Sequence, residues 1–165
     1  MTRILFVCMG NICRSPTVEA VARAEFARAQ LDIEVASAGT EDYHVGAQAD
    51  PRAIAVAEAA GYAMAAHRAR QVQPADFGRY DLLLGMDRVN LRRLERMRSD
   101  PRPDTTCRPE LFLRHAGIEP IELPDPYYGG THDFELALEL ARRGIAALIA
   151  RMRADAGSDA TASRA

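Results

Sequence analysis

Hydrophobic residues recur along this chain in short continuous runs and in longer stripes at helical spacing, and the two kinds alternate. Residues 4–7 form the apolar run ILFV, which is typical of a buried strand. Residues 18–29 place apolar side chains at helical spacing. The polar and glycine-containing residues 9–14 separate the two, and Ser15-Pro16 predicts the helix start, with Ser15 as N-cap. The first segment is therefore predicted to form a strand, a loop and a helix.

The same alternation continues to about residue 153. Residues 31–35 alternate apolar with polar, which predicts a half-buried strand at the edge of a sheet. Next come a helix opened by Asp50-Pro51 and ended near Gly61, and a strand over 80–84. A helix capped by Asp87 follows, with Leu91, Leu94 and Met97 facing inward. The last predicted elements are a strand at 111–113 and a long helix capped by Thr131. Strands that alternate with helices predict an α/β fold, in which a parallel sheet carries helices on both faces.

The length of 165 residues fits one domain, which we place at residues 1–153. Residues 154–165 are small, polar and without pattern, so we expect a disordered C-terminal tail. No run approaches 18 apolar residues, and the apolar run at the start is too short for a signal peptide. We therefore expect no membrane contact and a cytoplasmic location, with secretion as an effector left open.

Charge and cysteine content narrow the classes of function. The chain has 21 basic residues, all arginine, and 23 acidic ones, for a formal net charge of −2. This balance argues against nucleic-acid binding, and the lack of lysine excludes a lysine nucleophile. Three cysteines do not suggest a disulfide framework. Cys8 and Cys13 lack a second Cys/His pair at zinc spacing, and Gly10-Asn11-Ile12 does not fit a dinucleotide motif, so we expect no metal and no cofactor.

The loop after the first strand carries the candidate chemistry. Cys8 stands at the carboxyl end of a strand, where open α/β sheets bind ligands. A loop that opens into a helix points backbone N–H groups inward and binds a tetrahedral oxyanion such as phosphate. Gly10 and Asn11 tolerate left-handed conformations, and Arg14 can clamp two oxygens of the anion. These groups would also stabilise a Cys8 thiolate, which predicts phosphoryl transfer through a cysteinyl-phosphate. The plain alternative is a buried strand-end cysteine before an ordinary loop.

Residues 7–16, VCMGNICRSP, closely resemble the phosphate-loop signature of the low-molecular-weight protein tyrosine phosphatases, in their bacterial form. Further segments that look like this family, in family order, are SAGT at 37–40, HVG at 44–46, DPR at 50–52, HRARQ at 67–71, residues 86–91 and DPYYGG at 125–130. The resemblance covers about residues 3 to 150. It implies a single-domain, Rossmann-like or flavodoxin-like twisted sheet of four parallel strands in the order 2-1-3-4. It also implies metal-independent hydrolysis of phosphotyrosine and aryl phosphates.

The resemblance also implies the role of each residue. Cys8 would be the nucleophile, Arg14 the phosphate clamp and Asp125 the general acid and base. Residues implied to bind phosphate or the substrate ring are Met9, Gly10, Asn11, Ile12, Cys13, Ser15, Tyr43, Tyr127 and Tyr128. Asn11, Ser15, Ser37 and His67 would form a hydrogen-bond network that shapes the loop, with Glu19 paired to His67. Cys13 would protect Cys8 through a reversible disulfide.

Two other functions use a similar loop. A thiol-dependent arsenate reductase needs a relay of further cysteines, and only Cys107 is left for it. A non-catalytic phosphoprotein-binding module would have no need of both Cys8 and Asp125. The expected partners are a phosphotyrosine protein, with a bacterial tyrosine kinase as one candidate, and phosphate or another oxyanion in the site. The arginines at 88, 92, 93, 96, 98 and 102 suggest either a docking face for acidic substrates or a solvated helix face; interleaved acidic residues favour the second.

Overall fold

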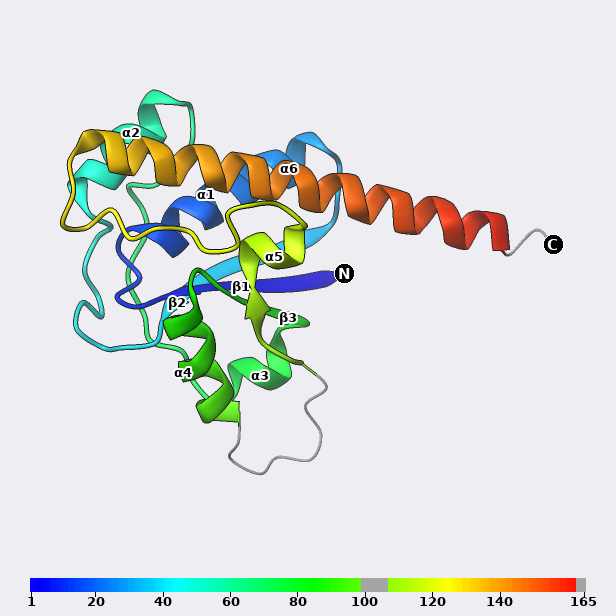
Figure 1. Cartoon of the computed structure of the whole chain (residues 1–165), viewed down its shortest axis with the longest axis horizontal. Helices are drawn as coiled ribbons and strands as arrows, with labels where there is room; N and C mark the ends of the chain where they lie inside the picture. Colours follow the sequence, from blue (N-terminus) through cyan, green and yellow to red (C-terminus); the bar gives the residue numbers. More distant parts are fainter. Residues whose placement is uncertain (99–106, 163–165) are drawn as a thin grey trace.

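The computed structural model describes residues 1–98 and 107–162, and its centre is a sheet of four parallel strands (Figure 1). The strands are β1 (Thr2–Cys8), β2 (Ile33–Gly39), β3 (Leu82–Gly85) and β4 (Glu110–Leu111). Their order is β2-β1-β3-β4 and every neighbouring pair is parallel, which confirms the predicted topology. The half-buried strand predicted at an edge is β2, although it begins at Ile33 and continues to Gly39.

Helices cover both faces of the sheet, as expected (Figure 1). Alternate residues of β1 face opposite sides: Ile4 and Phe6 belong to one buried cluster, and Leu5 and Val7 to the other. The first cluster is completed by α1 (Arg14–Arg28), α2 (Pro51–Ala59), α5 (Phe112–Ala116) and α6 (Thr131–Ala162). The second lies under α3 (Asp76–Arg79) and α4 (Arg88–Arg98).

Several helix boundaries match the sequence signals. Asp50 caps α2, since its side chain accepts a hydrogen bond from the Arg52 N–H, and Pro51 is the first helical residue. Gly61 lies just after that helix with a φ of 88°, the left-handed conformation that glycine adopts without strain. Asp87 caps α4, and Leu94 is fully buried beneath it.

The strand predicted at 111–113 is wrong in its extent. Only Glu110–Leu111 pairs with β3, and Phe112 and Leu113 begin α5. A short apolar run does not distinguish a buried strand from a buried helix. Packing decides here, because the Phe112 ring meets the Phe6 ring edge-on at 5.4 Å between centroids.

The expected disorder of residues 154–165 also differs from the structure. Helix α6 continues through Ala162, and residues 163–165 lie outside the described residues. The segment after residue 153 is rich in alanine and contains no proline, so a helix that is already formed propagates through it. Figure 1 shows this end of α6 beyond the rest of the fold. Among the helices described, none is both long and apolar enough to cross a membrane.

The carboxyl ends of three strands meet at one edge of the sheet. Cys8 pairs with Gly39, and Val7 pairs with both Ala38 and Gly85. A Cβ at Gly39 would lie only 2.5 Å from the Met9 carbonyl oxygen, so the glycine lets the loop after β1 cross close to β2. The loops after β1, β2 and β3 therefore converge at the edge where parallel sheets bind ligands.

Candidate active site

The loop between β1 and α1 forms the floor of a cavity of about 320 Å³. The residues that line it are Cys8, Met9, Gly10, Ile12, Cys13, Arg14, Tyr43, His44, Asp125, Tyr127 and Tyr128. The three predicted catalytic residues thus share one cavity with most of the predicted binding residues. His44 was not predicted as a site residue; the only sequence signal was the HVG segment at 44–46.

Asn11 is the centre of a hydrogen-bond network beneath this loop. It is fully buried, and its φ of 57° is the left-handed conformation expected from the sequence. Its side-chain amide donates to the hydroxyls of Ser15 and Ser37, at 2.9 Å in both cases. Its side-chain oxygen accepts from the Arg70 N–H at 3.0 Å. These contacts hold a backbone conformation that costs about 1–3 kcal/mol in a residue other than glycine.

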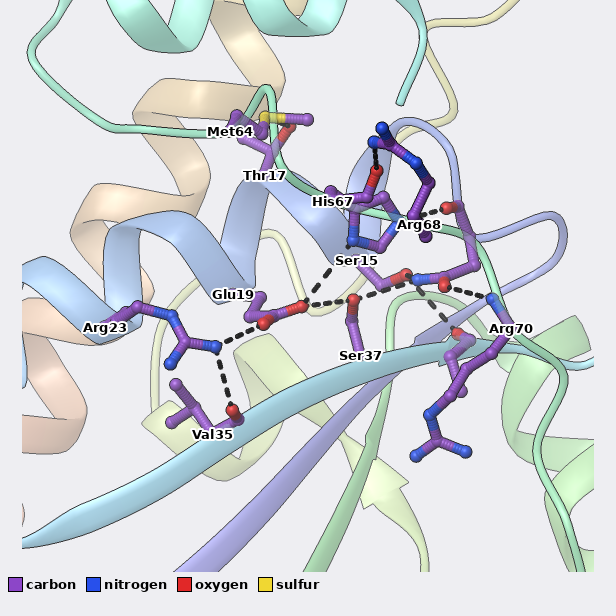
Figure 2. Close-up of polar contacts among 12 residues, drawn as sticks. Ser15, Thr17, Glu19, Arg23, Val35, Ser37, Met64, His67, Arg68 and Arg70 are labelled. Carbon is purple, nitrogen blue, oxygen red and sulfur yellow. Dashed lines mark hydrogen bonds and ion pairs between the residues drawn. The ribbon is translucent and has the colours of Figure 1, made fainter. Parts of the chain in front are cut away.

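The outer part of this network runs through Ser37 and Glu19 to Arg23, which is 64% exposed (Figure 2). Ser37 donates to Glu19 at 2.6 Å, and Glu19 pairs with Arg23 at 2.5 Å. His67 Nε2 lies 2.8 Å from the Asn11 carbonyl oxygen, and its Nδ1 lies 3.9 Å from Glu19. Because a carbonyl oxygen only accepts, Nε2 carries the hydrogen of this bond. The structure brings together the predicted network of Asn11, Ser15, Ser37, His67 and Glu19.

Ser15 is not the N-cap of α1, contrary to the sequence prediction. The helix begins two residues earlier than predicted, at Arg14, with Cys13 at the cap position and no side-chain cap bond. The Ser15 hydroxyl instead lies 3.0 Å from Cys8 Sγ and accepts from Asn11. The Asn11 N–H also points at Cys8 Sγ, at 3.3 Å. The sulfur therefore faces two polar groups able to stabilise a negative charge.

We expect Asn11→Ala to destabilise the protein by about 3 kcal/mol, because it removes buried hydrogen bonds and the residue's tolerance of positive φ. Asn11→Gly removes the same side chain but keeps the conformational freedom, so it should cost about 1 kcal/mol less than Asn11→Ala. Urea unfolding of the three proteins measures both differences. Equal stability of the two variants would show that backbone strain at this position contributes nothing.

Arg14 enters the site from the first turn of α1 and is almost completely buried. Its Nη1 donates to Asp87 at 2.6 Å and to the Leu123 carbonyl at 3.3 Å, and its Nη2 lies 3.5 Å from Asp125. Burial lowers the pKa of this guanidinium, but Cys8, Asp87 and Asp125 together outweigh burial and raise it above its usual value. Arg14 is thus a fixed positive charge with an oriented fork.

Asp87 is a site residue that the sequence did not identify. Its Oδ1 accepts from the Asn90 N–H at 2.8 Å and caps α4, while its Oδ2 holds Arg14. Its capping role was predicted, but nothing in the sequence links it to Arg14, which lies 73 residues earlier. One carboxylate therefore connects the end of β3 with the phosphate loop.

Asp87→Asn should lower kcat/KM for an aryl phosphate about 10- to 100-fold, because Arg14 loses the partner that orients it. Asparagine also caps helices well, so the stability of α4 should change little. Asp87→Ala is the matched variant, since it removes both functions and should add about 1 kcal/mol of destabilisation. Steady-state kinetics and thermal unfolding separate the two effects. Full activity of Asp87→Asn would remove this carboxylate from the site.

The loop that carries Asp125 is tied to α2 by Arg52. The Arg52 guanidinium donates to the Tyr127 carbonyl at 3.0 Å, pairs with Asp50 at 2.8 Å and lies 4.6 Å from the centre of the Phe134 ring. The hydrogen bond from Arg52 lowers the pKa of Asp50. These contacts give the Arg52 of the DPR segment a role, whereas the sequence indicated only that Asp50-Pro51 opens a helix and that the segment resembles the family. They place the Asp125 carboxylate, 43% exposed, above Arg14.

Tyrosines surround the mouth of the cavity. Tyr43 and Tyr128 are 68% and 94% exposed, and Tyr127 stacks edge-on against Tyr128 at 4.9 Å between ring centroids. Ile12 adds an apolar side chain to the lining. The cavity thus combines a polar, positively charged floor with aromatic sides.

The other two cysteines differ from Cys8 in their surroundings. Cys13 is a free, buried thiol that lines the cavity, and burial, followed by the charge of Asp50, raises its pKa. Cys107 is buried in the cluster under α3 and α4, on the other face of the sheet. Across residues 1–98 and 107–162, no group of three or more His, Cys, Asp and Glu residues is placed to hold a metal ion.

Residues 3–158 match the family model described as low molecular weight phosphotyrosine protein phosphatase. A low molecular weight protein-tyrosine-phosphatase of Streptomyces coelicolor is 42% identical over 158 residues, which cover 92% of this chain and 93% of the relative. A protein tyrosine phosphatase of Entamoeba histolytica, solved with Hepes in its active site, superposes with a TM-score of 0.84 at 32% identity, covering 94% of this chain and 99% of that one. A Drosophila arginine phosphatase superposes with a TM-score of 0.86 at 30% identity, covering 92% and 98%.

Proposed function

The chain belongs to the low molecular weight phosphotyrosine protein phosphatases, and we propose the role of each of its active-site residues in phosphate hydrolysis. Its activity is the hydrolysis of phosphotyrosine in proteins. The observation that carries our assignment is the shared cavity, in which Cys8 lies at the floor, Arg14 beside it and Asp125 above Arg14 at 3.5 Å.

In the first step, Cys8 attacks phosphorus and the bond between phosphorus and the phenolic oxygen breaks. The loop N–H groups and Arg14 hold the non-bridging oxygens, whose negative charge they stabilise in the transition state. Asp125 gives its proton to the departing phenolate, so that the product leaves as a neutral phenol. A cysteinyl-phosphate is left on the enzyme.

In the second step, Asp125 takes a proton from water, which attacks phosphorus and releases the Cys8 thiolate. The Ser15 hydroxyl, 3.0 Å from Cys8 Sγ, stabilises this leaving group by hydrogen bonding. The Asn11 N–H lies on the same sulfur and supports it further. No metal takes part, since the charge on phosphate is met by Arg14 and the backbone.

The aromatic sides of the cavity favour phosphotyrosine over phosphoserine. Tyr43 and Tyr127 offer flat surfaces for a phenyl ring, and Ile12 offers an apolar contact. A shorter phosphoserine side chain would leave these surfaces unfilled. An arsenate reductase is disfavoured because Cys107 lies on the opposite face of the sheet from the cluster that contains Cys8. A non-catalytic phosphoprotein-binding module is disfavoured because binding alone does not need a carboxylate such as Asp125 beside Arg14.

The test is hydrolysis of para-nitrophenyl phosphate in excess chelator at mildly acid pH, followed by phosphotyrosine, phosphoserine and phosphoarginine peptides. Phosphoarginine is included because one structural relative is an arginine phosphatase. We expect chelator-resistant activity and a preference for phosphotyrosine. A preference for phosphoarginine would overturn the substrate assignment. No activity in fully reduced protein would redirect the test to arsenate reduction with an external thiol, and then to binding alone.

Cys13 is proposed as the partner of Cys8 in a reversible disulfide. Peroxide would convert Cys8 to a sulfenic acid, and attack by Cys13 would form the disulfide and release water. Because burial raises the pKa of the Cys13 thiol, it does not compete with Cys8 for phosphate in the reduced enzyme, and it attacks only after oxidation has made the Cys8 sulfur an electrophile beside it. Cys13→Ser should therefore retain its activity in reducing buffer within about twofold. Without the disulfide, excess peroxide should oxidise its Cys8 beyond the sulfenic acid to the sulfinic acid, so dithiothreitol should restore activity to the wild type but not to the variant. Equal recovery of both proteins would contradict the proposal.

A phosphoprotein is the class of partner that the family assignment supports. A bacterial tyrosine kinase as that partner, and a cytoplasmic location, are proposals that rest on the sequence. Co-purification of Cys8→Ser with tyrosine-phosphorylated proteins from its native cell would test the first, and cell fractionation the second.

A further inference from the structure

A second groove, of about 420 Å³, lies directly beside the active-site cavity. The residues that line it are Met9, Thr40, Glu41, Tyr43, Val89, Arg92, Arg93 and Arg96. Met9 and Tyr43 line both hollows, so the two are separated by no more than these side chains. Three of its residues are arginines of α4, the helix that follows β3 at the catalytic edge of the sheet (Figure 1).

The arginines of α4 differ in their partners. Arg88 pairs with Glu122 and Arg93 pairs with Glu41, each at 3.2 Å. Over the parts of the chain that the structure describes, no ion pair is found for Arg92 or Arg96. These two stand four positions apart, so they share one helix face and repel each other.

Three acidic residues interleaved with these arginines, Asp87, Glu95 and Asp100, favoured the interpretation of this stretch as a solvated helix face. Glu95 is on α4 but does not line the groove, and Asp100 lies outside the described residues. Asp87 does not line the groove either. Its carboxylate instead turns to Arg14 and to the first turn of α4. The exposed residues Arg92 and Arg96 therefore line a groove next to the catalytic cavity, and the acidic residue in its lining, Glu41, pairs with Arg93. Arg98 lies on the same helix outside the groove, and Arg102 lies outside the described residues.

We propose that this groove binds an acidic side chain that flanks the phosphotyrosine of the protein substrate. The inference rests on the proposed function, because it takes the phosphotyrosine to be in the adjacent cavity. An extended peptide advances about 3.3–3.6 Å per residue, so residues within a few positions of the phosphotyrosine reach a groove that shares a side with that cavity. Arg92 and Arg96 offer forked donors that match a carboxylate.

The remaining lining fits the same ligand. Met9, Tyr43 and Val89 are 40%, 68% and 53% exposed, and they form apolar surface around the basic residues. An acidic residue can therefore place its methylene groups on this surface and its carboxylate at the arginines. The pairing of Arg93 with Glu41 leaves two positive charges, which suits one or two acidic side chains of the substrate.

The experiment compares two phosphotyrosine peptides that differ only in Glu or Gln at the positions flanking the phosphotyrosine. The enzymes are the wild-type protein, Arg92→Gln/Arg96→Gln, and a control, Arg114→Gln/Arg142→Gln, which removes the same charge from residues that line neither hollow. We expect the wild type to prefer the Glu peptide by about fivefold in kcat/KM, mainly through KM, at low salt. The preference should fall below about twofold in Arg92→Gln/Arg96→Gln and persist in the control.

Turnover of para-nitrophenyl phosphate should be the same in all three proteins, because this substrate does not reach the groove. The inference is overturned if the wild type shows no preference for the Glu peptide, or if the control loses that preference as well. It is also overturned if Arg92→Gln/Arg96→Gln lowers kcat/KM equally for both peptides. If wild-type protein does not hydrolyse para-nitrophenyl phosphate, the proposed function fails. Fluorescence anisotropy of both peptides with Cys8→Ser, with and without the two groove substitutions, still decides whether the groove selects the Glu peptide.

Discussion

Replacing Cys8 by serine should abolish turnover while phosphate binding survives. We expect kcat for para-nitrophenyl phosphate to fall by at least about 10⁴-fold, because a serine hydroxyl has no base beside it and is a much weaker nucleophile than a thiolate. The oxyanion contacts of the loop N–H groups and Arg14 do not pass through the sulfur. The dissociation constant for inorganic phosphate, measured by calorimetry, should therefore change by less than about tenfold.

The control for this experiment is the thermal stability of Cys8→Ser, which shows whether the variant keeps its fold. Cys8 Sγ is in contact with Ser15 and with the Asn11 N–H, and serine can make hydrogen bonds to both. The thermal unfolding midpoint should therefore stay within a few degrees, which corresponds to about 1 kcal/mol or less. Loss of phosphate binding together with turnover would indicate collapse of the loop and not the loss of a nucleophile.

Replacing Asp125 by alanine should slow substrates in proportion to how poor their leaving group is. A tyrosine phenolate needs a proton as it departs, so we expect kcat/KM for a phosphotyrosine peptide to fall about 10²- to 10³-fold. A substrate with a strongly acidic phenol departs without protonation and should lose less than about tenfold. The quantity to measure is kcat/KM, because it reports formation of the cysteinyl-phosphate and excludes its later hydrolysis.

A matched variant separates the loss of the carboxyl group from the loss of side-chain volume. Asp125→Asn keeps the size of the side chain and removes both the proton and the charge near Arg14. If Asp125 is the general acid, the two variants should show the same dependence on the leaving group. Uniform slowing across leaving groups in both would remove Asp125 from that role and point to a part in positioning Arg14.

The sequence alone determined most of the fold, because its signals are local. The apolar run at 4–7, the capping residues Asp50 and Asp87 and the alternation at 31–35 each act within a few residues, and each predicted an element that the structure contains. Where a signal was ambiguous, tertiary packing decided. Phe112 lies in α5 and not in a strand, because its ring packs on Phe6, more than 100 positions away in the chain.

In the candidate site, too, the sequence predicted the local features and the tertiary structure decided the distant contacts. Cys8, Arg14 and the loop between them lie within seven residues, so the sequence alone could predict an anion cradle above a thiol. Asn11 was assigned to a network by resemblance, but its binding to Arg70, 59 residues later, depends on the path of a distant loop. Ser15 was expected to cap its helix, and only the closeness of β1 and α1 turned its hydroxyl to the Cys8 sulfur.

What only the tertiary structure decided is which distant side chains meet. Arg14 is held by Asp87, Arg52 holds the loop of Asp125, and Arg92 and Arg96 face a groove beside the catalytic cavity. Backbone propensity and hydrophobic periodicity act over a few residues, so they specify elements and the loops between them. Ion pairs and hydrogen bonds across more than 70 residues depend on the packed arrangement of the sheet and its helices, and no local pattern in the chain encodes that arrangement.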